Sequence, residues 1–420
     1  MYSVAAITLG CKVNQYDTEA ILRDFAAIGF NICSHKAQAD VYLINTCTVT
    51  NMSDKKSRQM INMARQMNPN AVVVAYGCYA QVEPEALRKI DGVSLVIGTE
   101  DKARVAEIVA AQLEMGVVPS TSMPPSKRTR AYLKIQDGCD QFCSYCIVPY
   151  ARGSVKSRPI NELVSEAREL VAVGCKEIVL TGIQIASYGK DFTDGNITEL
   201  IRPLSTLHGL KRLRLGSLDP SIVTDDFINA LEKTSIICDH FHLSLQSGCN
   251  ITLKKMNRKY TTTEYVAAAD KLRQSFPQST LTTDIIVGFP GESNEDFAES
   301  MDFVKKMGFF RVHVFPYSPK KGTPAADMPH QIGQSLKKQR SQQMRDLANK
   351  LNLITYQQYL RKTVPVLFES KVNGYWEGHS TQYLTIRVKS KLGLENNIVA
   401  VDLKHIKDGI AYGEVRKDNA

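Results

Sequence analysis

The chain has 420 residues, which is enough for two or three domains, and its 43% hydrophobic and 23% charged residues are typical of an ordinary globular protein. No apolar run approaches the roughly 20 residues that a membrane-spanning helix requires, so the sequence argues against a membrane protein. The ten cysteines lack the spacing of a small disulfide-bonded domain. They favour metal ligation in a reducing compartment, and we therefore expect a cytoplasmic protein.

The formal net charge of +9 is distributed unevenly along the chain. Residues 1–115 carry 11 Lys or Arg and 12 Asp or Glu, so the positive surplus lies in the remaining residues. Residues 337–362 hold one acidic residue, Asp346, and seven basic ones: Lys337, Lys338, Arg340, Arg345, Lys350, Arg361 and Lys362. Such a segment indicates a polyanionic partner, although the solvated face of a helix explains the same pattern.

Residues 1–115 alternate short β-branched runs with amphipathic stretches. This alternation predicts an α/β domain in which helices cover a parallel sheet. The expected strands are residues 4–10, 41–46, 71–77 and 93–98. The expected helices are residues 15–28, 54–67, 83–90 and 102–113.

Three cysteines follow these expected strands directly: Cys11, Cys47 and Cys78. The carboxyl ends of parallel strands meet at one edge of a sheet, which is where ligands bind in open α/β folds. Three thiolates that converge there suit an iron–sulfur cluster with one iron left without a protein ligand. The alternative is that these cysteines are simply buried, since Cys is common in protein cores. Cys33 lies outside the pattern.

Residues 116–127 are rich in Pro and Ser and are expected to form a linker. Beyond it, Cys139, Cys143 and Cys146 stand in a C-x3-C-x2-C arrangement. A zinc site would more naturally contain two C-x2-C pairs, and three cysteines this close together cannot all form disulfides. The spacing therefore predicts a second cubane cluster, whose open iron can bind a small molecule through an amine and a carboxylate.

From residue 130 onward the alternation of strands and helices resumes. Six strand–helix units in about 200 residues predict a partial (β/α)6 barrel, because a complete eight-unit barrel typically needs about 250 residues. The carboxyl ends of its strands should line a binding site. The residues expected there are Gly182, Gln184, Ser217, Gln246 and Gly288.

Two further patterns follow residue 330. Residues 331–360 are expected to form one long helix that carries the basic face described above. From Thr363 to Ala420, short alternating strands separated by Gly and Asn turns predict a small antiparallel barrel. Its basic and aromatic side chains suit single-stranded or looped RNA, although core aromatics with a solvated surface would explain them equally well. The residues concerned are Lys371, Tyr375, Trp376, Tyr383, Arg387, Lys389 and Lys391.

Six motifs along the chain together resemble those of the radical S-adenosylmethionine (SAM) methylthiotransferase family: LGCKVNQYDTEA, INTCTVT, YGCYAQ, DGCDQFCSYCIVPYARG, SLQSGC and DIIVGFPGE. The resemblance implies an N-terminal methylthiotransferase domain (1–115), a linker (116–127), a radical SAM domain (128–330), a basic connecting helix (331–362) and a C-terminal TRAM domain (363–420). GCKVN and YARG are most similar to the subgroup that converts N6-threonylcarbamoyladenosine (t6A), beside the tRNA anticodon, into its 2-methylthio form. Sister subgroups act on isopentenyladenosine in tRNA or on an aspartate of a ribosomal protein, and both substrates remain alternatives.

The resemblance also implies two [4Fe–4S] clusters and SAM as cofactors. The cluster that cleaves SAM would be held by Cys139, Cys143 and Cys146, and Tyr145 would lie near the adenine of SAM. The auxiliary cluster, which supplies sulfur, would be held by Cys11, Cys47 and Cys78. No side chain is expected to act as a catalytic acid or base, because a radical derived from SAM breaks the C2–H bond of the adenine. The implied partners are a tRNA anticodon stem-loop and an electron donor, and we expect a monomer.

The t6A base carries a free carboxylate, so a site for it should contain a cation. Arg152 and Arg158 follow the second cysteine triple closely and are the candidates. A guanidinium can bind a carboxylate through two parallel hydrogen bonds, which a lysine cannot reproduce. The alternative for each arginine is that it binds a tRNA phosphate or braces the cluster loop.

Overall fold

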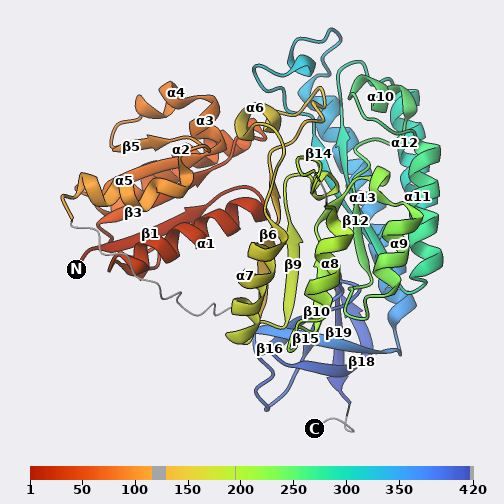
Figure 1. Cartoon of the computed structure of the whole chain (residues 1–420). Coiled ribbons are helices and arrows are strands. Elements are labelled where there is room, and N and C mark those ends of the chain that lie inside the picture. The colour runs from red at the N-terminus through yellow and green to blue at the C-terminus, as the bar shows by residue number, and fades with distance from the viewer. Residues whose placement is uncertain (116–128, 194, 417–420) are drawn as a thin grey trace. The chain divides into compact units, whose positions relative to one another are not determined.

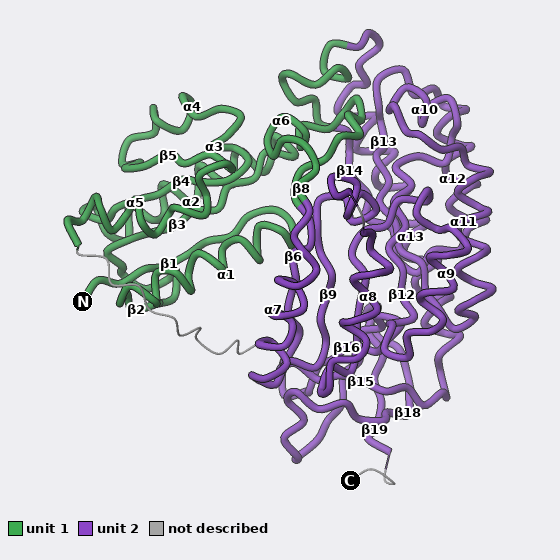
Figure 2. Tube along the Cα trace, viewed as in Figure 1, with its two compact units in different colours: residues 1–125, 137–156, 318–327 green, residues 126–136, 157–317, 328–420 purple. Residues whose placement is uncertain are grey.

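The computed structural model describes residues 1–115, 129–193 and 195–416, so the expected linker at 116–127 lies outside the described residues. The chain divides into two compact units, which are coloured separately in Figure 2. The first unit comprises residues 1–125, 137–156 and 318–327. The second comprises residues 126–136, 157–317 and 328–420. Of the helices described, none is both long enough and apolar enough to cross a membrane.

The first unit is built on a five-stranded parallel sheet with the strand order β2-β1-β3-β4-β5 (Figure 1). Its strands are β1 (Ser3–Thr8), β2 (Asn31–Cys33), β3 (Val41–Thr46), β4 (Val72–Gly77) and β5 (Leu95–Ile97). Its sheet is accompanied by the helices α1 (Lys12–Ala27), α2 (Asn51–Met67), α3 (Cys78–Val82), α4 (Pro84–Arg88) and α5 (Val105–Gln112). The α/β architecture expected for this part of the chain is confirmed.

Helices cover both faces of this sheet, and the central strand β3 is buried along its whole length. Ile44 belongs to a buried cluster that includes Ile61 of α2. Leu43, which points to the opposite face, belongs to a cluster that includes Phe25 of α1. Successive residues of a strand point to opposite faces, so a strand covered on both sides has no hydrophobic alternation. The continuous apolar run of β3 follows from this arrangement.

The ends of several elements differ from those expected. Strand β2 was not expected, because it is only three residues long and lies at the sheet edge, where it pairs with β1. Helix α2 begins three residues earlier than expected, at Asn51, because the Thr50 hydroxyl accepts a hydrogen bond from the Ser53 amide (3.2 Å) and caps the helix. Helix α3 begins at Cys78 itself.

The second unit contains the expected partial barrel, whose parallel strands follow one another in chain order within two sheets, β10-β9-β6 and β11-β12-β13-β14. A parallel bridge between Leu213 and Ile237 links the two sheets. The strands are β6 (Arg130–Lys134), β9 (Glu177–Thr181), β10 (Arg212–Leu215), β11 (Ser217–Leu218), β12 (His240–Leu243), β13 (Thr280–Val287) and β14 (Arg311–Pro316). The intervening helices are α7 (Ile160–Ala172), α8 (Ile197–Ser205), α9 (Asp225–Glu232), α10 (Asn250–Lys255), α11 (Thr262–Ser275) and α12 (Asn294–Met307).

A closed five-stranded barrel, with the order β15-β16-β17-β19-β18, forms the C-terminal part of the second unit. Two of its hairpins turn at Asn373-Gly374 and Asp408-Gly409, where all four residues have positive φ angles. Asn-Gly and Asp-Gly are the preferred pairs for two-residue hairpin turns, so these turns fix the register of their strands. The strands are β15 (Thr363–Val372), β16 (Tyr375–Ser380), β17 (Thr385–Val388), β18 (Ile398–Lys407) and β19 (Ile410–Val415).

Within the second unit, two buried arginines of β10 bind the C-terminal barrel through its main chain. Arg214 donates to the carbonyl oxygens of Ser380 and Thr381 at 3.1 and 3.0 Å, and Arg212 donates to those of His379 and Pro365 at 2.8 and 2.9 Å. Glu177, which is fully buried, accepts two hydrogen bonds from Arg214 at 2.7 and 3.3 Å. Burial alone would raise the pKa of Glu177, but the surrounding arginines, Arg214 above all, lower it to about 2.

Helix α13 (Gln334–Tyr359) confirms the expected long helix, but its basic face is smaller than the sequence indicated. Lys337 and Arg340 are 3% and 2% exposed. Lys337 donates to the Tyr317 carbonyl oxygen (3.0 Å), and Arg340 is ion-paired with Glu292 (2.6 Å). Both point into the protein, so counting them as part of a phosphate-binding face was wrong.

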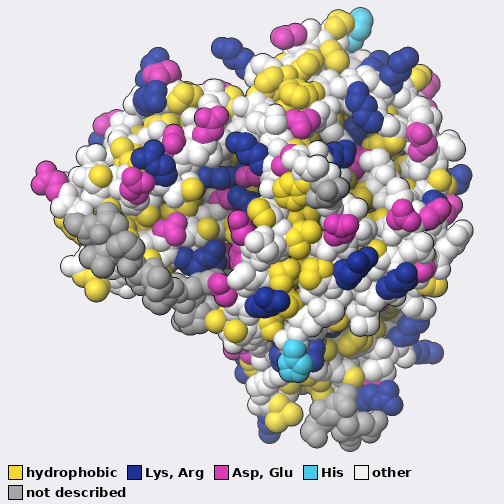
Figure 3. All heavy atoms as spheres, in the orientation of Figure 1, with side chains coloured by type: hydrophobic (Ala, Val, Ile, Leu, Met, Phe, Trp, Pro, Cys, Tyr) yellow, Lys and Arg dark blue, Asp and Glu magenta, His cyan; other side chains and the backbone are white. Residues whose placement is uncertain are grey.

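Of the other basic residues of this segment, Arg345 is half-buried, and the exposed ones are Lys338, Lys350, Arg361 and Lys362. On the face of the molecule shown in Figure 3, Lys and Arg side chains are interspersed with Asp and Glu side chains. Trp376 and Tyr383 are also structural: Trp376 is 7% exposed, and the ring of Tyr383 lies under the guanidinium of Arg214, 4.7 Å from its centroid. Trp376 therefore belongs to the core of the barrel, whereas Tyr383 is half-buried, and a role of either residue in RNA binding stays a prediction.

Candidate functional site

The three cysteines expected at the sheet edge of the first unit lie where the sequence placed them. Cys11 immediately precedes α1, Cys47 follows β3, and Cys78 is the first residue of α3 after β4. Cys47 and Cys78 are buried, whereas Cys11 is exposed. Because β1, β3 and β4 are adjacent and parallel, their carboxyl ends bring the three thiols to one edge.

Two glycines allow the backbone to approach this edge closely. Gly10 has a φ of 100°, and a Cβ at this position would lie 3.0 and 3.1 Å from Cβ and Sγ of Cys47. Gly77 has a φ of 96°, and a Cβ there would lie 2.6 Å from Oδ1 of Asn45. Any side chain at either position would be strained and would push against a neighbour of the thiols.

The electrostatics of the three thiols favour a positively charged ligand. Burial raises the pKa of the Cys47 thiol, and the neighbouring Cys78 and Cys11 thiols raise it further. Burial also raises the pKa of the Cys78 thiol, and Arg152 opposes this effect. Thiolates are the form that ligates iron, and iron ions would compensate the charges that accumulate when all three ionise. The donor set therefore fits an iron–sulfur cluster.

Arg152, expected to contact substrate or to brace the loop, lies at this edge and is nearly inaccessible, with 2% of its side chain exposed. Its Nε donates to Sγ of Cys78 at 3.2 Å. Its Nη1 donates to Oδ1 of Asp137 at 2.8 Å, and its Nη2 donates to Oδ1 of Asn14. Nη1 of Arg152 also lies 3.5 Å from Oδ2 of Asp17. These contacts connect a thiol of the first triple to both ends of the loop that carries the second.

A second cation, Lys102, balances the carboxylates around Arg152. Its Nζ lies 3.0 Å from Oδ2 of Asp17 and 2.6 Å from Oδ2 of Asp137. This edge of the sheet thus contains two cations and two carboxylates in addition to the thiols. With their charges balanced, Arg152 can remain next to Cys78 in a buried position.

The loop with Cys139, Cys143 and Cys146 runs between Asp137 and helix α6 (Val148–Arg152). The Cys139 amide donates to the Gly153 carbonyl oxygen (3.0 Å), which closes the loop at its base, and the Cys146 amide donates to the Cys143 carbonyl oxygen (2.9 Å). Gly138 has a φ of 71°, and a Cβ there would lie 1.9 Å from the Ser154 carbonyl oxygen. Only glycine fits this position, so the DGC motif is a backbone requirement of the loop.

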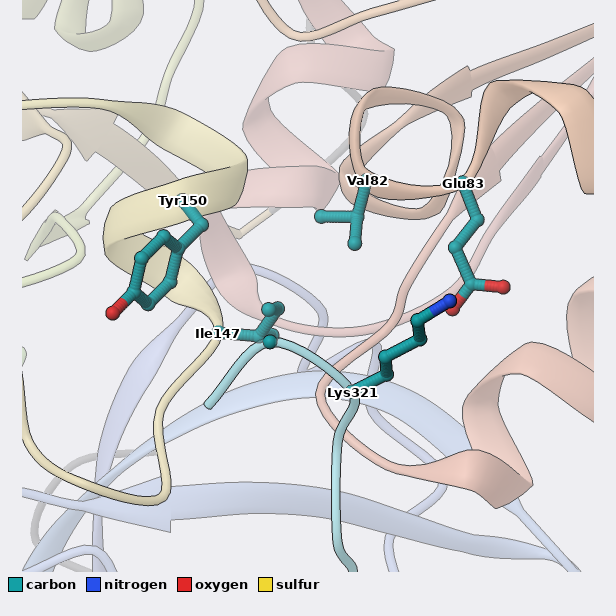
Figure 4. A pocket seen from close by; sticks show the side chains of 6 residues that line it. Val82, Glu83, Ile147, Tyr150 and Lys321 are labelled. Atoms are coloured by element: carbon teal, nitrogen blue, oxygen red, sulfur yellow. The ribbon is translucent and has the colours of Figure 1, made fainter. Parts of the chain in front are cut away.

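Residues 318–327, far away in sequence, pack on this loop within the same unit. The Ala325 amide donates to the Ser144 carbonyl oxygen (2.8 Å), and buried Lys320 is ion-paired with Asp54 of α2 (2.5 Å). A surface cavity of about 320 Å³ lies beside them. Figure 4 shows Ile147 and Val82 on its wall, with the Lys321 ammonium pointing toward the Glu83 carboxylate. The cavity borders both α3 and α6, which follow Cys78 and Cys146.

In the second unit, the residues expected to line the barrel site lie at the carboxyl ends of strands. The Gln184 amide donates to Oε1 of Gln136 (3.0 Å), and the hydroxyls of Ser217 and Ser244 are hydrogen-bonded (2.7 Å). Gly182 follows β9, while Gln246 and Gly288 have φ angles of 74° and 70°. The structure brings these five positions to one edge of the barrel strands. Their contacts with SAM, like that of Tyr145 in the cluster loop, stay predictions.

The sequence did not reveal a buried ion pair at the same edge. Nη2 of Arg258 lies 2.9 Å from Oδ2 of Asp219, and the side chain of each residue is at most 6% exposed. Nε2 of Gln184 lies 3.5 Å from the same Asp219 oxygen. Asp219 directly follows β11, so its place at the end of a strand could have predicted a position at this edge. Arg258 comes from a loop 39 residues later, and no sequence pattern indicates its position.

Arg158, the second candidate for the substrate carboxylate, belongs to the second unit. Its Nη1 donates to the Lys134 carbonyl oxygen (3.1 Å) and to Oε2 of Glu166 (2.8 Å). Its side chain is 27% exposed. The assignment of Arg152 and Arg158 to substrate stays a prediction, and their contacts differ: Arg152 is enclosed, whereas Arg158 reaches solvent.

The sequence and the fold of the chain are similar to those of known proteins. A family model described as "Radical SAM superfamily" matches residues 133–304, and one described as "Uncharacterized protein family UPF0004" matches residues 3–98. A Bacillus subtilis relative, "Threonylcarbamoyladenosine tRNA methylthiotransferase MtaB", is 39% identical over 99% of this chain and 96% of its own length. An Alkaliphilus oremlandii relative, "tRNA-2-methylthio-N(6)-dimethylallyladenosine synthase", is 35% identical over 86% of this chain and 81% of its own.

A solved structure of the radical SAM methyltransferase TsrM from Kitasatospora setae resembles the fold, with a TM-score of 0.57 and 16% identity over 78% of this chain and 77% of that one. The fold and the family models therefore define a radical SAM enzyme, which uses SAM and a [4Fe–4S] cluster. The chain belongs to the radical SAM methylthiotransferase family, and it is a tRNA methylthiotransferase.

Proposed function

We propose that this enzyme converts t6A at position 37 of tRNA into 2-methylthio-t6A. The observation that carries the proposal is the match over nearly the whole chain to a relative whose name specifies threonylcarbamoyladenosine, at 39% identity. Dimethylallyladenosine is the second candidate substrate, because a relative named for it matches at 35% identity over 86% of the chain. The two bases differ in charge: t6A carries a carboxylate, whereas the dimethylallyl group is hydrocarbon.

Two metal centres would serve this reaction. Cys139, Cys143 and Cys146 would hold the [4Fe–4S] cluster that binds SAM, and an auxiliary [4Fe–4S] cluster would be held by Cys11, Cys47 and Cys78. When bound, these groups would supply the radical that removes hydrogen from C2 of the adenine and the sulfur that replaces it. Arg152 supports this assignment, because it joins Cys78 to the loop of the other triple within one compact unit.

The protein's own residues would position the base and the cofactor. The adenine must leave its stack to be reached, so the anticodon loop has to open on binding. The exposed residues Lys338, Lys350, Arg361 and Lys362 are candidates for phosphate contacts, as are Lys389 and Lys391 of the C-terminal barrel. We further propose a monomer that works in the cytoplasm, where tRNA is modified, and receives electrons from a separate donor.

Arg158 is the better candidate for binding the t6A carboxylate, because the partners of Arg152 support the alternative that it braces the loop. Losing a guanidinium–carboxylate contact of Arg158 should cost roughly 2 kcal/mol, at the lower end of the range for buried pairs, because the side chain reaches solvent. Arg158→Lys keeps the charge but removes the paired hydrogen bonds. We expect it to reduce selectivity between two anticodon stem-loops that are identical except for the threonylcarbamoyl group. If selectivity is unchanged, the cation must come from another residue.

The deciding experiment measures tRNA nucleosides by mass spectrometry in a strain that lacks this protein. We expect 2-methylthio-t6A to disappear and t6A to accumulate, with 2-methylthio-dimethylallyladenosine unchanged. Wild-type protein should restore the modified base, and a variant with Cys139, Cys143 and Cys146 replaced by Ala should not. Loss of the dimethylallyl product instead would assign the enzyme to the second substrate.

A further inference from the structure

Three side chains that the reaction above does not use meet on one face of the barrel strands in the second unit. Strands β12, β13 and β14 are adjacent and parallel, and their register pairs His242 with Thr282 and Asp284 with His313. Residues in register across a parallel sheet share a face, as do residues two apart on one strand. His242, Asp284 and His313 therefore point the same way. One nitrogen of each histidine and one oxygen of the carboxylate all lie within 4.8 Å of one another.

The hydrogen bonds around His242 orient it for ligation. Its Nδ1 lies 3.0 Å from Oγ1 of Thr282, and its Nε2 lies 3.3 Å from Oδ2 of Asp284. Oγ1 of Thr282 is also 3.0 Å from Nε2 of His240. When Thr282 donates its single proton to His240, it accepts from Nδ1–H of His242. The Nε2 lone pair of His242 then faces Oδ2 of Asp284, and the two repel each other. A cation bound between them would be ligated by both atoms.

The donor set selects a cation over an anion and indicates its class. Two imidazole nitrogens and one carboxylate oxygen suit zinc, iron(II) and related divalent ions, and a histidine that ligates a metal commonly donates its other N–H to a fixed acceptor. Thr282 supplies that acceptor for His242 when its own proton is donated to His240. Arg311, which shares this face because it lies two residues before His313 on β14, donates to Thr385 (3.0 Å) and stacks on Phe310, so its charge is directed at the C-terminal barrel.

The three side chains are accessible. The side chains of His242 and Asp284 are 16% and 28% exposed, and His313 is exposed. Three protein ligands on one side of an ion leave coordination positions for water or another oxygen ligand on the other side. This is the arrangement of an open site, in contrast to the four-ligand closed sites that only stabilise a fold.

We propose that His242, Asp284 and His313 bind one divalent transition-metal ion of the zinc or iron(II) class, separately from both cysteine triples. The proposal does not depend on which base the enzyme modifies.

The test uses full-length protein with its iron–sulfur clusters reconstituted anaerobically, so that the cysteines are occupied. The protein is dialysed against ZnCl2, and bound zinc and iron are measured by mass spectrometry. His313→Gln and Asp284→Asn are compared with His405→Gln, which changes an exposed histidine of β18 stacked on Tyr412. We expect one zinc ion per chain in the wild type and in His405→Gln. In His313→Gln and Asp284→Asn, zinc affinity should fall sharply. Losing a hydrogen-bond partner of a metal ligand costs about 10–100-fold in affinity, and the loss of a ligand itself should cost more.

X-ray absorption at the zinc edge identifies the ligands. A nitrogen and oxygen shell at about 2.0–2.2 Å, with no sulfur at about 2.3 Å, would support the proposal. A sulfur shell, or equal zinc binding by the wild type and His313→Gln, would overturn it and leave the three residues as a hydrogen-bonded chain. His313 is exposed, so its replacement should not impair folding, and an unchanged iron content confirms that the clusters are intact.

Discussion

Nε of Arg152 lies 3.2 Å from Sγ of Cys78, although the two residues are 74 positions apart in the chain. Arg152 ends the loop that carries one cysteine triple, and Cys78 belongs to the other. A buried guanidinium beside a thiolate stabilises the negative charge on sulfur. The contact therefore joins the two cysteine sites electrostatically as well as mechanically.

The first prediction concerns the reduction potential of the auxiliary cluster. Hydrogen bonds to cluster sulfur and nearby positive charge raise the potential, because reduction adds negative charge. In protein with Cys139, Cys143 and Cys146 replaced by Ala, we expect Arg152→Gln to lower the midpoint potential of the remaining cluster and Arg152→Lys to lower it less. A redox titration followed by electron paramagnetic resonance measures both.

Arg58→Gln is the matched control for this prediction. Arg58 donates to the Tyr79 hydroxyl (2.9 Å), one residue beyond Cys78, and within the described part of the chain it makes no hydrogen bond to a thiol. Its replacement should leave the potential unchanged. An unchanged midpoint in Arg152→Gln, with the cluster still present, would contradict the role given to Arg152.

The second prediction concerns iron content. Two cubane clusters require about eight iron atoms per chain after anaerobic reconstitution. Replacing Cys139, Cys143 and Cys146 with Ala should halve the iron and abolish SAM cleavage. Replacing Cys11, Cys47 and Cys78 should also halve it, stop sulfur insertion and preserve some SAM cleavage. If the second variant keeps its full iron, the auxiliary-cluster assignment is wrong.

The third prediction concerns tRNA binding. The logarithm of the affinity falls as the logarithm of the salt concentration rises, and each phosphate contact makes this slope steeper by about one. Lys338→Gln and Lys350→Gln remove exposed charges from α13 and should weaken tRNA binding and reduce this slope. Gln339→Ala, an exposed and uncharged neighbour, should change neither quantity. Filter binding at several salt concentrations measures both, and equal slopes in all variants would exclude this helix from the interface.

The fourth prediction concerns stability against pH. The pKa of Glu177 is lowered to about 2 in the folded protein, against 4.5 as its ordinary value. The stabilisation is therefore complete above about pH 4.5 and is lost as the pH falls toward 2, because the unfolded chain binds the proton first. The difference corresponds to about 3 kcal/mol for this buried group. The free energy of unfolding is measured at each pH by urea unfolding. The fluorescence of Trp376, the only tryptophan, reports the unfolding of the C-terminal barrel.

Glu177→Gln separates this effect from general acid unfolding. The variant leaves Arg212 and Arg214 buried with less compensation, so it should be less stable at pH 7 by about 3–5 kcal/mol. Its stability should also fall less between pH 4.5 and 2 than that of the wild type. Equal pH dependence in both proteins would show that Glu177 is not the titrating group.

The cysteine positions in the first unit could be predicted from the sequence because each follows a buried strand, and such strands are recognisable as apolar runs. The same reasoning located Gly182 and Gln246 at the barrel edge. The Arg152–Cys78 contact and the grouping of His242, Asp284 and His313 could not be predicted, because they depend on the spatial approach or register of segments far apart in the chain.

The burial of Lys337 and Arg340 had a signal that was overlooked. They fall in the helical series that continues through Met344, Ala348 and Leu351, all of which are buried. Spacings of three and four residues place this series on one face of the helix. A charge count along a helix misses this distinction, whereas the periodicity of its apolar residues assigns each charge to the inner or outer face.

Arg212 and Arg214 bind the C-terminal barrel through carbonyl oxygens of His379, Ser380 and Thr381, not through side chains. Every amino acid supplies that carbonyl, so the hydrogen bonds from Arg212 and Arg214 do not depend on which side chains stand at these three positions. The demands on these side chains come from other contacts: His379 is hydrogen-bonded to Glu369 (2.6 Å), and the Thr381 hydroxyl donates to Asp239 (3.2 Å). A mutational scan should find positions 212 and 214 intolerant even of lysine, whereas sensitivity at residues 379–381 should follow the contacts of their own side chains.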